Sequence, residues 1–229
     1  EVWVCGGQSN MEWPLNKCLD PEADIAASTD PSLRLFKVRM AAADAPAEDV
    51  VAQWTACGPE AVAAFSGVGY YFGRELRARL GVPVGLIQSC LGGTNVSSWV
   101  RRETMADDPE FANFTEDYEK AVANMEAETE RYKRERAAYD ARAAQLRAEG
   151  KPVPPAGPFL NQGPMSPTHP KRPAALYYGM ICPLQPFAIR GAIWYQGEGN
   201  SQAAFQYRRF FPAMIREWQG ALLRLIQEN

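Results

Sequence analysis

The sequence predicts an α/β fold in which a mostly parallel sheet presents a functional site at the ends of its strands. Three short apolar stretches have the composition of buried strands, and each is followed by a glycine-containing loop. These stretches cover residues 2–5, 82–87 and 189–195, with helix-like sequence between them. Alternating strands and helices are typical of parallel sheets, which bind their ligands beyond the carboxyl ends of the strands.

Other segments complete the predicted framework. Residues 33–38 alternate between apolar and charged side chains, which predicts a further strand. Apolar residues at helical spacing predict a helix over 68–80, and Gly81 ends it. Residues 20–32 hold two Asp-Pro turn or cap signals around a short helix, and residues 207–218 predict another helix.

Two segments lie outside this alternating pattern. Residues 110–149 contain no Gly or Pro and many charges of both signs, which predicts an inserted long helix or helical hairpin. A thin apolar seam recurs every seven residues at Tyr118, Met125, Tyr132, Tyr139 and Leu146. We favour packing of this insertion on its own domain over helix-mediated contacts with a partner. Residues 151–173 hold eight of the 18 prolines and predict a Pro-rich loop over the domain.

Length and composition restrict the class of protein. The 229 residues fit one globular domain, and we interpret 1–229 as a single domain that is incomplete at both ends. The 24 basic and 27 acidic residues leave no basic excess for general binding to nucleic acid. No apolar stretch approaches the roughly 20 residues that cross a bilayer, so no membrane span is expected.

Cysteine spacing and glycine motifs give no indication of a metal or a cofactor. The five cysteines are irregularly spaced and form no C-x-x-C or C…H cluster. They are predicted to be buried reduced thiols, with one disulfide as the alternative. Neither the phosphate-binding nor the dinucleotide-binding glycine motif is present, so no cofactor is expected.

The first glycine loop presents a serine. Gly6 and Gly7 precede Gln8 and Ser9, and glycines at the end of a strand allow a sharp turn that exposes the serine hydroxyl. An ordinary turn serine is the alternative. The second loop contains Gly93, where the absence of a side chain lets a backbone N–H approach a ligand closely. A plain structural turn is the alternative there.

The third loop interleaves amide and acid side chains with glycine. Gln196, Glu198 and Asn200 follow a predicted buried strand and have no evident packing purpose. A carboxamide is a neutral hydrogen-bond donor, so it can bind a developing alkoxide without titrating. Gln196 fits that task best, and Asn200 is a second candidate.

Taken together, these motifs resemble the sialate O-acetylesterase family of the SGNH (GDSL-like) hydrolases. The resemblance lies in residues 7–12 (GQSNME), 92–94 (GGT) and 194–200 (WYQGEGN), and in the connecting segments 68–76 and 175–184. It implies a flavodoxin-like α/β/α sandwich that removes acetyl groups from carbohydrates. An acetylated carbohydrate is therefore the expected substrate, and glycan substrates suggest a secreted or periplasmic location.

The resemblance also implies roles for individual residues. Ser9 would be the nucleophile, and the backbone N–H groups of Ser9 and Gly93 would form an oxyanion hole with the side chain of Gln196. Four further residues match motif positions and are expected to orient the serine or to brace the loops: Gln8, Asn10, Glu198 and Asn200.

The sequence departs from the family pattern at the catalytic base. The family carries an Asp-x-x-His motif on a late loop, whereas the single histidine of this chain is His169, with Ser166 three residues before it. The base then lies beyond Asn229, or His169 substitutes for it; the flanking prolines favour the first interpretation. The chain on its own is expected to be weakly active or inactive.

Two tryptophans and two arginines are candidates for contacts with the sugar. Trp13 and Trp99 are placed at the rim of the site, although core packing explains them equally well. Arg74 and Arg101 are candidate partners for a sugar carboxylate, although surface salt bridges are the commoner use of arginine. The competing function is a non-catalytic carbohydrate-binding or scaffold protein that reuses this fold, and the absent His-Asp pair favours it.

Overall fold

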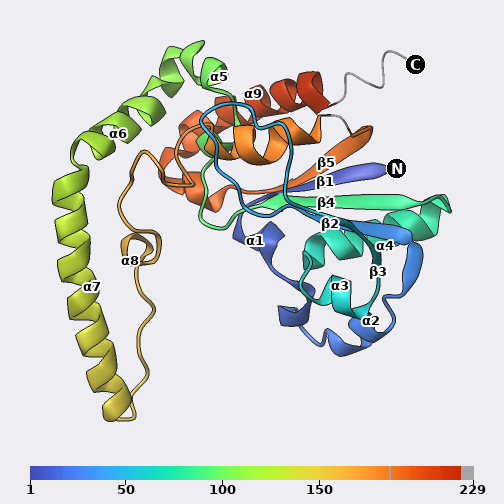
Figure 1. The fold of residues 1–229 in the computed structure, drawn as a ribbon, viewed down its shortest axis with the longest axis horizontal. Coiled ribbons are helices and arrows are strands. Elements are labelled where there is room, and N and C mark those ends of the chain that lie inside the picture. Colours follow the sequence, from blue (N-terminus) through green and yellow to red (C-terminus); the bar gives the residue numbers. More distant parts are fainter. Residues whose placement is uncertain (186, 223–229) are drawn as a thin grey trace.

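The computed structural model describes residues 1–185 and 187–222, which contain a five-stranded sheet in the order β3-β2-β4-β1-β5 (Figure 1). All strand pairs are parallel except β2–β3, which is antiparallel. The α/β fold class predicted from the sequence is therefore confirmed. The strands are β1 (Val2–Gly7), β2 (Asp30–Lys37), β3 (Trp54–Cys57), β4 (Val84–Cys90) and β5 (Ile189–Tyr195).

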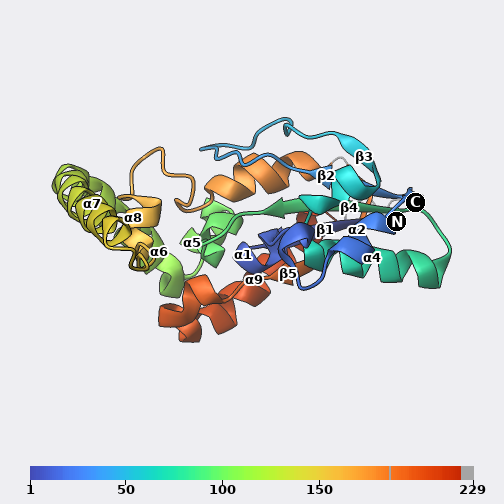
Figure 2. The ribbon, with the colours of Figure 1, turned by 90° about the horizontal axis from the view of Figure 1, so that it is seen from below.

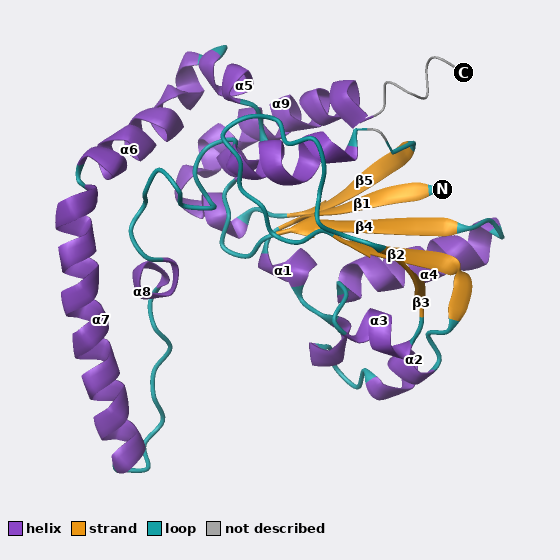
Figure 3. Cartoon of the chain, in the orientation of Figure 1, coloured by secondary structure: helices purple, strands orange, loops and turns teal. Residues whose placement is uncertain are grey.

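The register of the central strands brings three loops to one edge of the sheet. β1 lies between β4 and β5, and Gly7 pairs with Cys90 on one side and with Tyr195 on the other. The three strands thus end at the same level. Figure 3 shows them converging toward α1 (Ser9–Glu12), where the three glycine loops leave the sheet.

Alternating side chains along the strands build a core on each face of the sheet. On one face, Val4 and Ile87 pack with residues of η4 (Tyr177–Ile181) and α9 (Ala204–Leu222). On the other face, Cys5 and Leu86 pack with residues of α1 and α4 (Gly67–Leu80). Helical segments therefore cover both faces and fix the sheet from which the loops emerge.

The helices differ in detail from those predicted. α4 ends as expected at Gly81, which has φ +67, whereas α9 extends beyond both ends of the predicted helix over 207–218. Asp30 begins β2 instead of forming a turn. The remaining helices and single turns are η1 (Leu15–Lys17), α2 (Glu22–Ala26), α3 (Pro59–Ala63), η2 (Val96–Trp99), α5 (Arg102–Ala106), η3 (Pro109–Phe111), α6 (Ala112–Ala123), α7 (Met125–Ala148), α8 (Pro158–Gln162), η5 (Cys182–Leu184) and η6 (Glu198–Ala203).

Helices α6 and α7 form an arm that projects away from the sheet (Figures 1 and 2). The helices meet at Asn124, and the Pro-rich segment returns alongside α7 through α8. The ring of Tyr132 packs edge-on against Phe159 at 5.8 Å, and the Tyr139 hydroxyl donates to the carbonyl of Pro154 at 2.8 Å. Two tyrosines of the seven-residue seam, Tyr132 and Tyr139, thus contact the return segment of their own chain.

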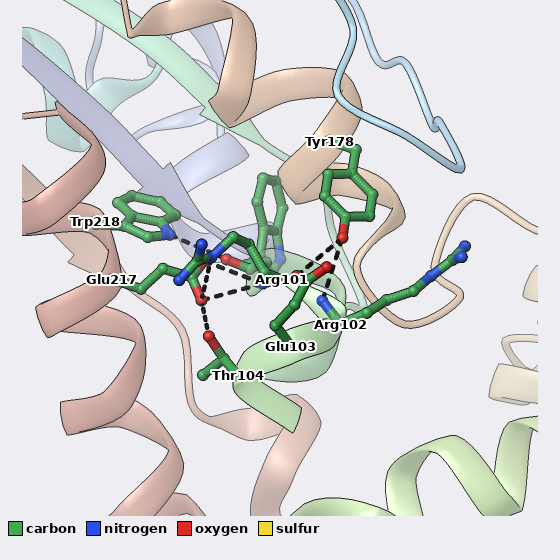
Figure 4. Close-up of polar contacts among 8 residues, drawn as sticks. Arg101, Arg102, Glu103, Thr104, Tyr178, Glu217 and Trp218 are labelled. Atoms are coloured by element: carbon green, nitrogen blue, oxygen red, sulfur yellow. Dashed lines mark hydrogen bonds and ion pairs between the residues drawn. The ribbon is translucent and has the colours of Figure 1, made fainter. Parts of the chain in front are cut away.

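A buried carboxylate joins α9 to the beginning of α5 (Figure 4). Glu217 accepts hydrogen bonds from the backbone N–H of Arg101, at 3.0 and 3.2 Å, and from the hydroxyl of Thr104. Burial raises the pKa of Glu217, although these hydrogen bonds and the nearby Arg101 guanidinium oppose that shift. The next residue, Trp218, donates from its indole N–H to the carbonyl of Trp99 at 3.0 Å.

All five cysteines lie in the described part of the chain and are free thiols, so the alternative of one disulfide is wrong for this structure. Burial raises the pKa of the Cys90 thiol to about 12 and that of Cys57 to about 11. Within residues 1–185 and 187–222, no helix is long and apolar enough to cross a membrane. The same residues contain no group of three or more potential metal-binding side chains.

Close backbone packing at Gly179 gives a test of this fold. A methyl group at Gly179 would collide with the backbone carbonyl of Ala41, whereas one at Gly157 would meet no atom within 4 Å. We expect Gly179→Ala to lower the free energy of unfolding by about 1–3 kcal/mol, because the backbone must shift to admit the methyl group. Gly157→Ala should change it by less than about 0.5 kcal/mol. Equal stabilities of the two variants in urea denaturation would contradict the packing described.

Candidate active site

All three loops begin where strand pairing stops. The backbone N–H of Leu91 donates to the carbonyl of Gly7 at 3.1 Å, and that of Gln8 donates to the carbonyl of Tyr195 at 3.0 Å. Gly7 has φ +140, and a side chain there would collide with the Tyr195 carbonyl. Glycine is therefore required immediately before the Gln8-Ser9 turn.

The first and second loops join beside Ser9. A Cβ placed on Gly92 would lie 3.4 Å from the Cβ of Ser9, and Oε2 of Glu12 accepts from the backbone N–H of Gly92 at 2.7 Å. Glu12 thus holds the glycine pair against the first loop. Ser9 itself is exposed at the start of α1.

Side chains of the first loop also bind the third loop. Oε1 of Gln8, which is buried, accepts from the backbone N–H groups of Gly197 at 3.4 Å and Gly199 at 3.1 Å. The Asn10 amide donates to Oε1 of Glu198 at 2.5 Å. These contacts join the first loop to the third, and the bracing and orienting roles of the three side chains stay predictions.

The buried amide of Asn200 joins the second and third loops. Its Oδ1 accepts from the backbone N–H of Val96 at 2.9 Å and from Nε2 of Gln196 at 2.7 Å. Nε2 of Gln196 donates its other hydrogen to the carbonyl of Thr94 at 3.1 Å. Both amide hydrogens of Gln196 are thus engaged between loops, while Oε1 of Gln196 and Nδ2 of Asn200 have no hydrogen-bond partner among the described residues.

Two residues missed by the sequence analysis reach the second loop from the Pro-rich return segment. Gly93 has φ +70, and a Cβ there would lie 2.6 Å from Nζ of Lys171 and 2.8 Å from Nε2 of Gln162. Partial burial lowers the pKa of Lys171, and Glu12 opposes that shift. No local pattern marks either residue, because their approach to Gly93 depends on the path of the whole arm.

His169 is engaged within its own segment. Its Nδ1 accepts from the backbone N–H of Lys171 at 3.1 Å, and its Nε2 lies 3.3 Å from the carbonyl oxygen of Gln162. This pairing places the ring proton on Nε2, so neither nitrogen is available to accept a proton from Ser9. Burial lowers the pKa of His169, with smaller contributions from the neighbouring cations Lys171 and Arg172, and the bond to Gln162 opposes them.

The predicted aromatic rim needs correction. Trp99 is fully buried and donates from its indole N–H to the hydroxyl of Thr94 at 3.0 Å, so it supports the second loop from below. Trp13 is half exposed and, with Asn10 and the exposed Tyr195, lines a hollow of about 380 Å³ beside the first loop. Tyr195 was missed, although its position at the end of a predicted strand was a usable signal.

The two arginines predicted to bind a sugar carboxylate instead pair with carboxylates of this chain. Arg74 forms an ion pair with Asp24 at 2.6 Å, and Arg101 lies 3.6 Å from Glu217. Both guanidinium groups therefore serve contacts within the chain, and neither lies among the three glycine loops.

Asn200 provides a test of the cross-loop bonds. Asn200→Ala leaves the N–H of Val96 and one amide hydrogen of Gln196 without an acceptor in a buried place. We expect it to lower the free energy of unfolding by about 2–4 kcal/mol, since each unsatisfied donor costs about 1–3 kcal/mol. Glu198→Ala, at the exposed end of the same loop, is the control and should cost less than about 1 kcal/mol. Similar losses for the two variants in urea denaturation would contradict the arrangement.

His169 predicts a pH dependence of stability. Because its folded pKa is lowered from 6.5, the unfolded chain takes up a proton at a higher pH than the folded chain. Its contribution to stability is complete above pH 6.5 and is lost as the pH falls from there toward the folded pKa. Between about pH 7.5 and pH 5.5, the wild type should lose more unfolding free energy than His169→Gln. Parallel losses in urea titrations at the two pH values would contradict this.

Comparison of the sequence with known proteins identifies the family of this chain. The family model of sialic acid-specific acetylesterases, which are carbohydrate esterases, matches residues 1–139, more than half of the chain. The chain is 27% identical to the sialate O-acetylesterases of Mus musculus and Homo sapiens. Each alignment covers 96% of this chain, 39% of the mouse protein and 35% of the human protein.

A solved structure shows the same relationship. The crystal structure of a carbohydrate acetylesterase from Xanthomonas citri superposes with a TM-score of 0.68 at 31% identity, over 96% of this chain and 38% of that one. The chain thus spans about two fifths of the length of these relatives. The resemblance predicted from the three glycine loops is confirmed, and the chain belongs to the sialic acid-specific acetylesterase family of carbohydrate esterases.

Proposed function

We propose that the full-length protein is a serine esterase that removes O-acetyl groups from carbohydrates. The observation that carries the proposal is the convergence of an exposed serine with two glycine loops at the ends of adjacent parallel strands. Gly92 lies against Ser9, and Glu12 holds its backbone there. Family membership supports the same reaction class.

The proposed reaction begins with attack of the Ser9 hydroxyl on the acetyl carbonyl. The backbone N–H groups of Ser9 and Gly93 then donate to the oxygen that becomes negative. Gln196 joins them by exchanging its bond to the Thr94 carbonyl, the longer of its two, for one to the oxyanion. A hydrogen bond to an ionised acceptor is about twice as strong as a neutral one, which favours the exchange. The sugar alcohol leaves, and water releases acetate from Ser9.

The proton acceptor for Ser9 is proposed to come from outside the described residues. Both ring nitrogens of His169 are engaged with residues 162–171, which argues against its substitution for the family histidine. The sugar is proposed to occupy the hollow between Trp13 and Tyr195, whose exposed rings offer faces for a pyranose. Asn10 lies in the same hollow, next to the nucleophile.

Acetate release by the full-length protein tests these roles. Ser9→Ala should abolish turnover of an O-acetylated sugar, because no other group forms the acyl intermediate. Gln196→Ala should lower kcat by about 10²–10³-fold, the usual cost of losing an oxyanion donor. Gln206→Ala is the control and should retain wild-type turnover, because this partly exposed glutamine on α9 bonds only the carbonyl of Glu110 among the described residues. Unchanged turnover in Gln196→Ala would reject its role.

A non-catalytic carbohydrate-binding protein is the second candidate. The observation in its favour is that the Ser9 hydroxyl has no hydrogen-bonded base within residues 1–185 and 187–222. Labelling by a fluorophosphonate, which reacts with activated serines, separates the two functions. Labelling of the full-length protein that is lost in Ser9→Ala supports the esterase, and its absence supports the binding protein.

A further inference from the structure

The Pro-rich return segment places two hydrogen-bond donors against the second glycine loop. Nζ of Lys171 and Nε2 of Gln162 lie 2.6 and 2.8 Å from the point that a side chain on Gly93 would occupy. Both nitrogens therefore pack directly against the α-carbon of Gly93, where any side chain would collide with them. The two donors therefore face one small region beside the loop that also lies against Ser9.

The backbone of Lys171 is fixed on both sides. Its N–H donates to Nδ1 of His169 at 3.1 Å, and its carbonyl accepts from the hydroxyl of Ser98 at 2.8 Å. The next residue, Arg172, is buried, forms an ion pair with Asp44 at 2.9 Å and donates to the carbonyl of His169 at 3.0 Å. Lys171 thus has a set position, unlike a lysine on an unconstrained surface loop.

Neither donor is engaged. Among the described residues, Nζ of Lys171 has no hydrogen bond and no ion pair within 4.0 Å, and Nε2 of Gln162 donates to no acceptor. The carboxylate of Glu12 raises the pKa of Lys171 through its charge, but its Oε2 is bound to the N–H of Gly92. A partly buried ammonium without a partner is costly, and an anion placed between the two donors removes that cost.

We propose that Lys171, together with Gln162, binds the carboxylate of an acidic acetylated sugar and so determines specificity for acidic over neutral substrates. The proposal rests on the proposed function for the identity of the ligand as a sugar. A carboxylate has two oxygens and accepts from both donors at once. It is also charged throughout the reaction, so it compensates the ammonium in the resting complex, whereas the oxyanion exists only transiently.

Equilibrium binding tests this without turnover. The full-length protein carrying Ser9→Ala is titrated, by calorimetry, with O-acetylated N-acetylneuraminic acid and with its methyl ester, which lacks the charge. We expect the acid to bind about tenfold tighter than the ester, the effect of one hydrogen-bonded charge. Lys171→Met should reduce this ratio to about one. Lys171→Arg, which keeps the charge, should retain most of it.

The control is Lys151→Met, because Lys151 is exposed and pairs with Glu149 at the far end of the same segment. It should leave the ratio unchanged. If Lys171→Met does not fold, Gln162→Leu decides the matter by removing the other donor, and it should lower the ratio. Equal binding of acid and ester, no binding of either, or a ratio unaffected by these variants would overturn the proposal.

Hydrolysis is measured separately, so the two proposals fail independently. A carboxylate preference without acetate release by the wild type would reject only the esterase function. Acetate release without a carboxylate preference would reject only the role of Lys171.

Discussion

The candidate site depends on hydrogen bonds that each loop provides for the backbone of another. Beyond the strand ends, the N–H groups of the loops lose their partners in the sheet, and buried N–H groups require replacements. Side chains of Gln8, Glu12 and Asn200 supply them, each accepting from a loop other than its own. Removal of one loop would leave unsatisfied groups in its neighbours, so the three loops form one cooperative unit.

The parallel register makes this unit possible. Because Gly7 pairs with both Cys90 and Tyr195, the three loops start at the same height and their short side chains can reach across. The arm contributes to the surroundings of this edge. The segment that returns from the arm ends beside Gly93. An insertion distant from the sheet therefore shapes the surroundings of the proposed nucleophile.

Much of the fold was predictable because its signals are local. The apolar strands, the glycine loops and the stop of α4 at Gly81 each depend on a few neighbouring residues. β3 was missed because four residues are too short to show a period, and it follows no glycine loop. The convergence of the loops was predicted from motif resemblance, since contacts between segments so distant in sequence leave no periodic trace.

The errors at the site arise because contacts between distant segments leave no local pattern in the sequence. Trp99 was placed at the rim because it lies near a motif, but nothing in the local sequence indicates that its ring points inward. Lys171 escaped notice among the prolines, and only the folded path of the arm brings it to Gly93. Sequence patterns thus predicted which loops form the site. The side chains that reach it from other segments could be identified only from the three-dimensional structure.

The most direct test of the convergence is a crystal structure of the full-length protein with a phosphonate attached to Ser9. We expect a phosphonyl oxygen about 2.7–3.1 Å from the backbone nitrogen of Gly93 and from the side-chain nitrogen of Gln196. A phosphonyl oxygen directed into solvent, with neither group in contact, would contradict it.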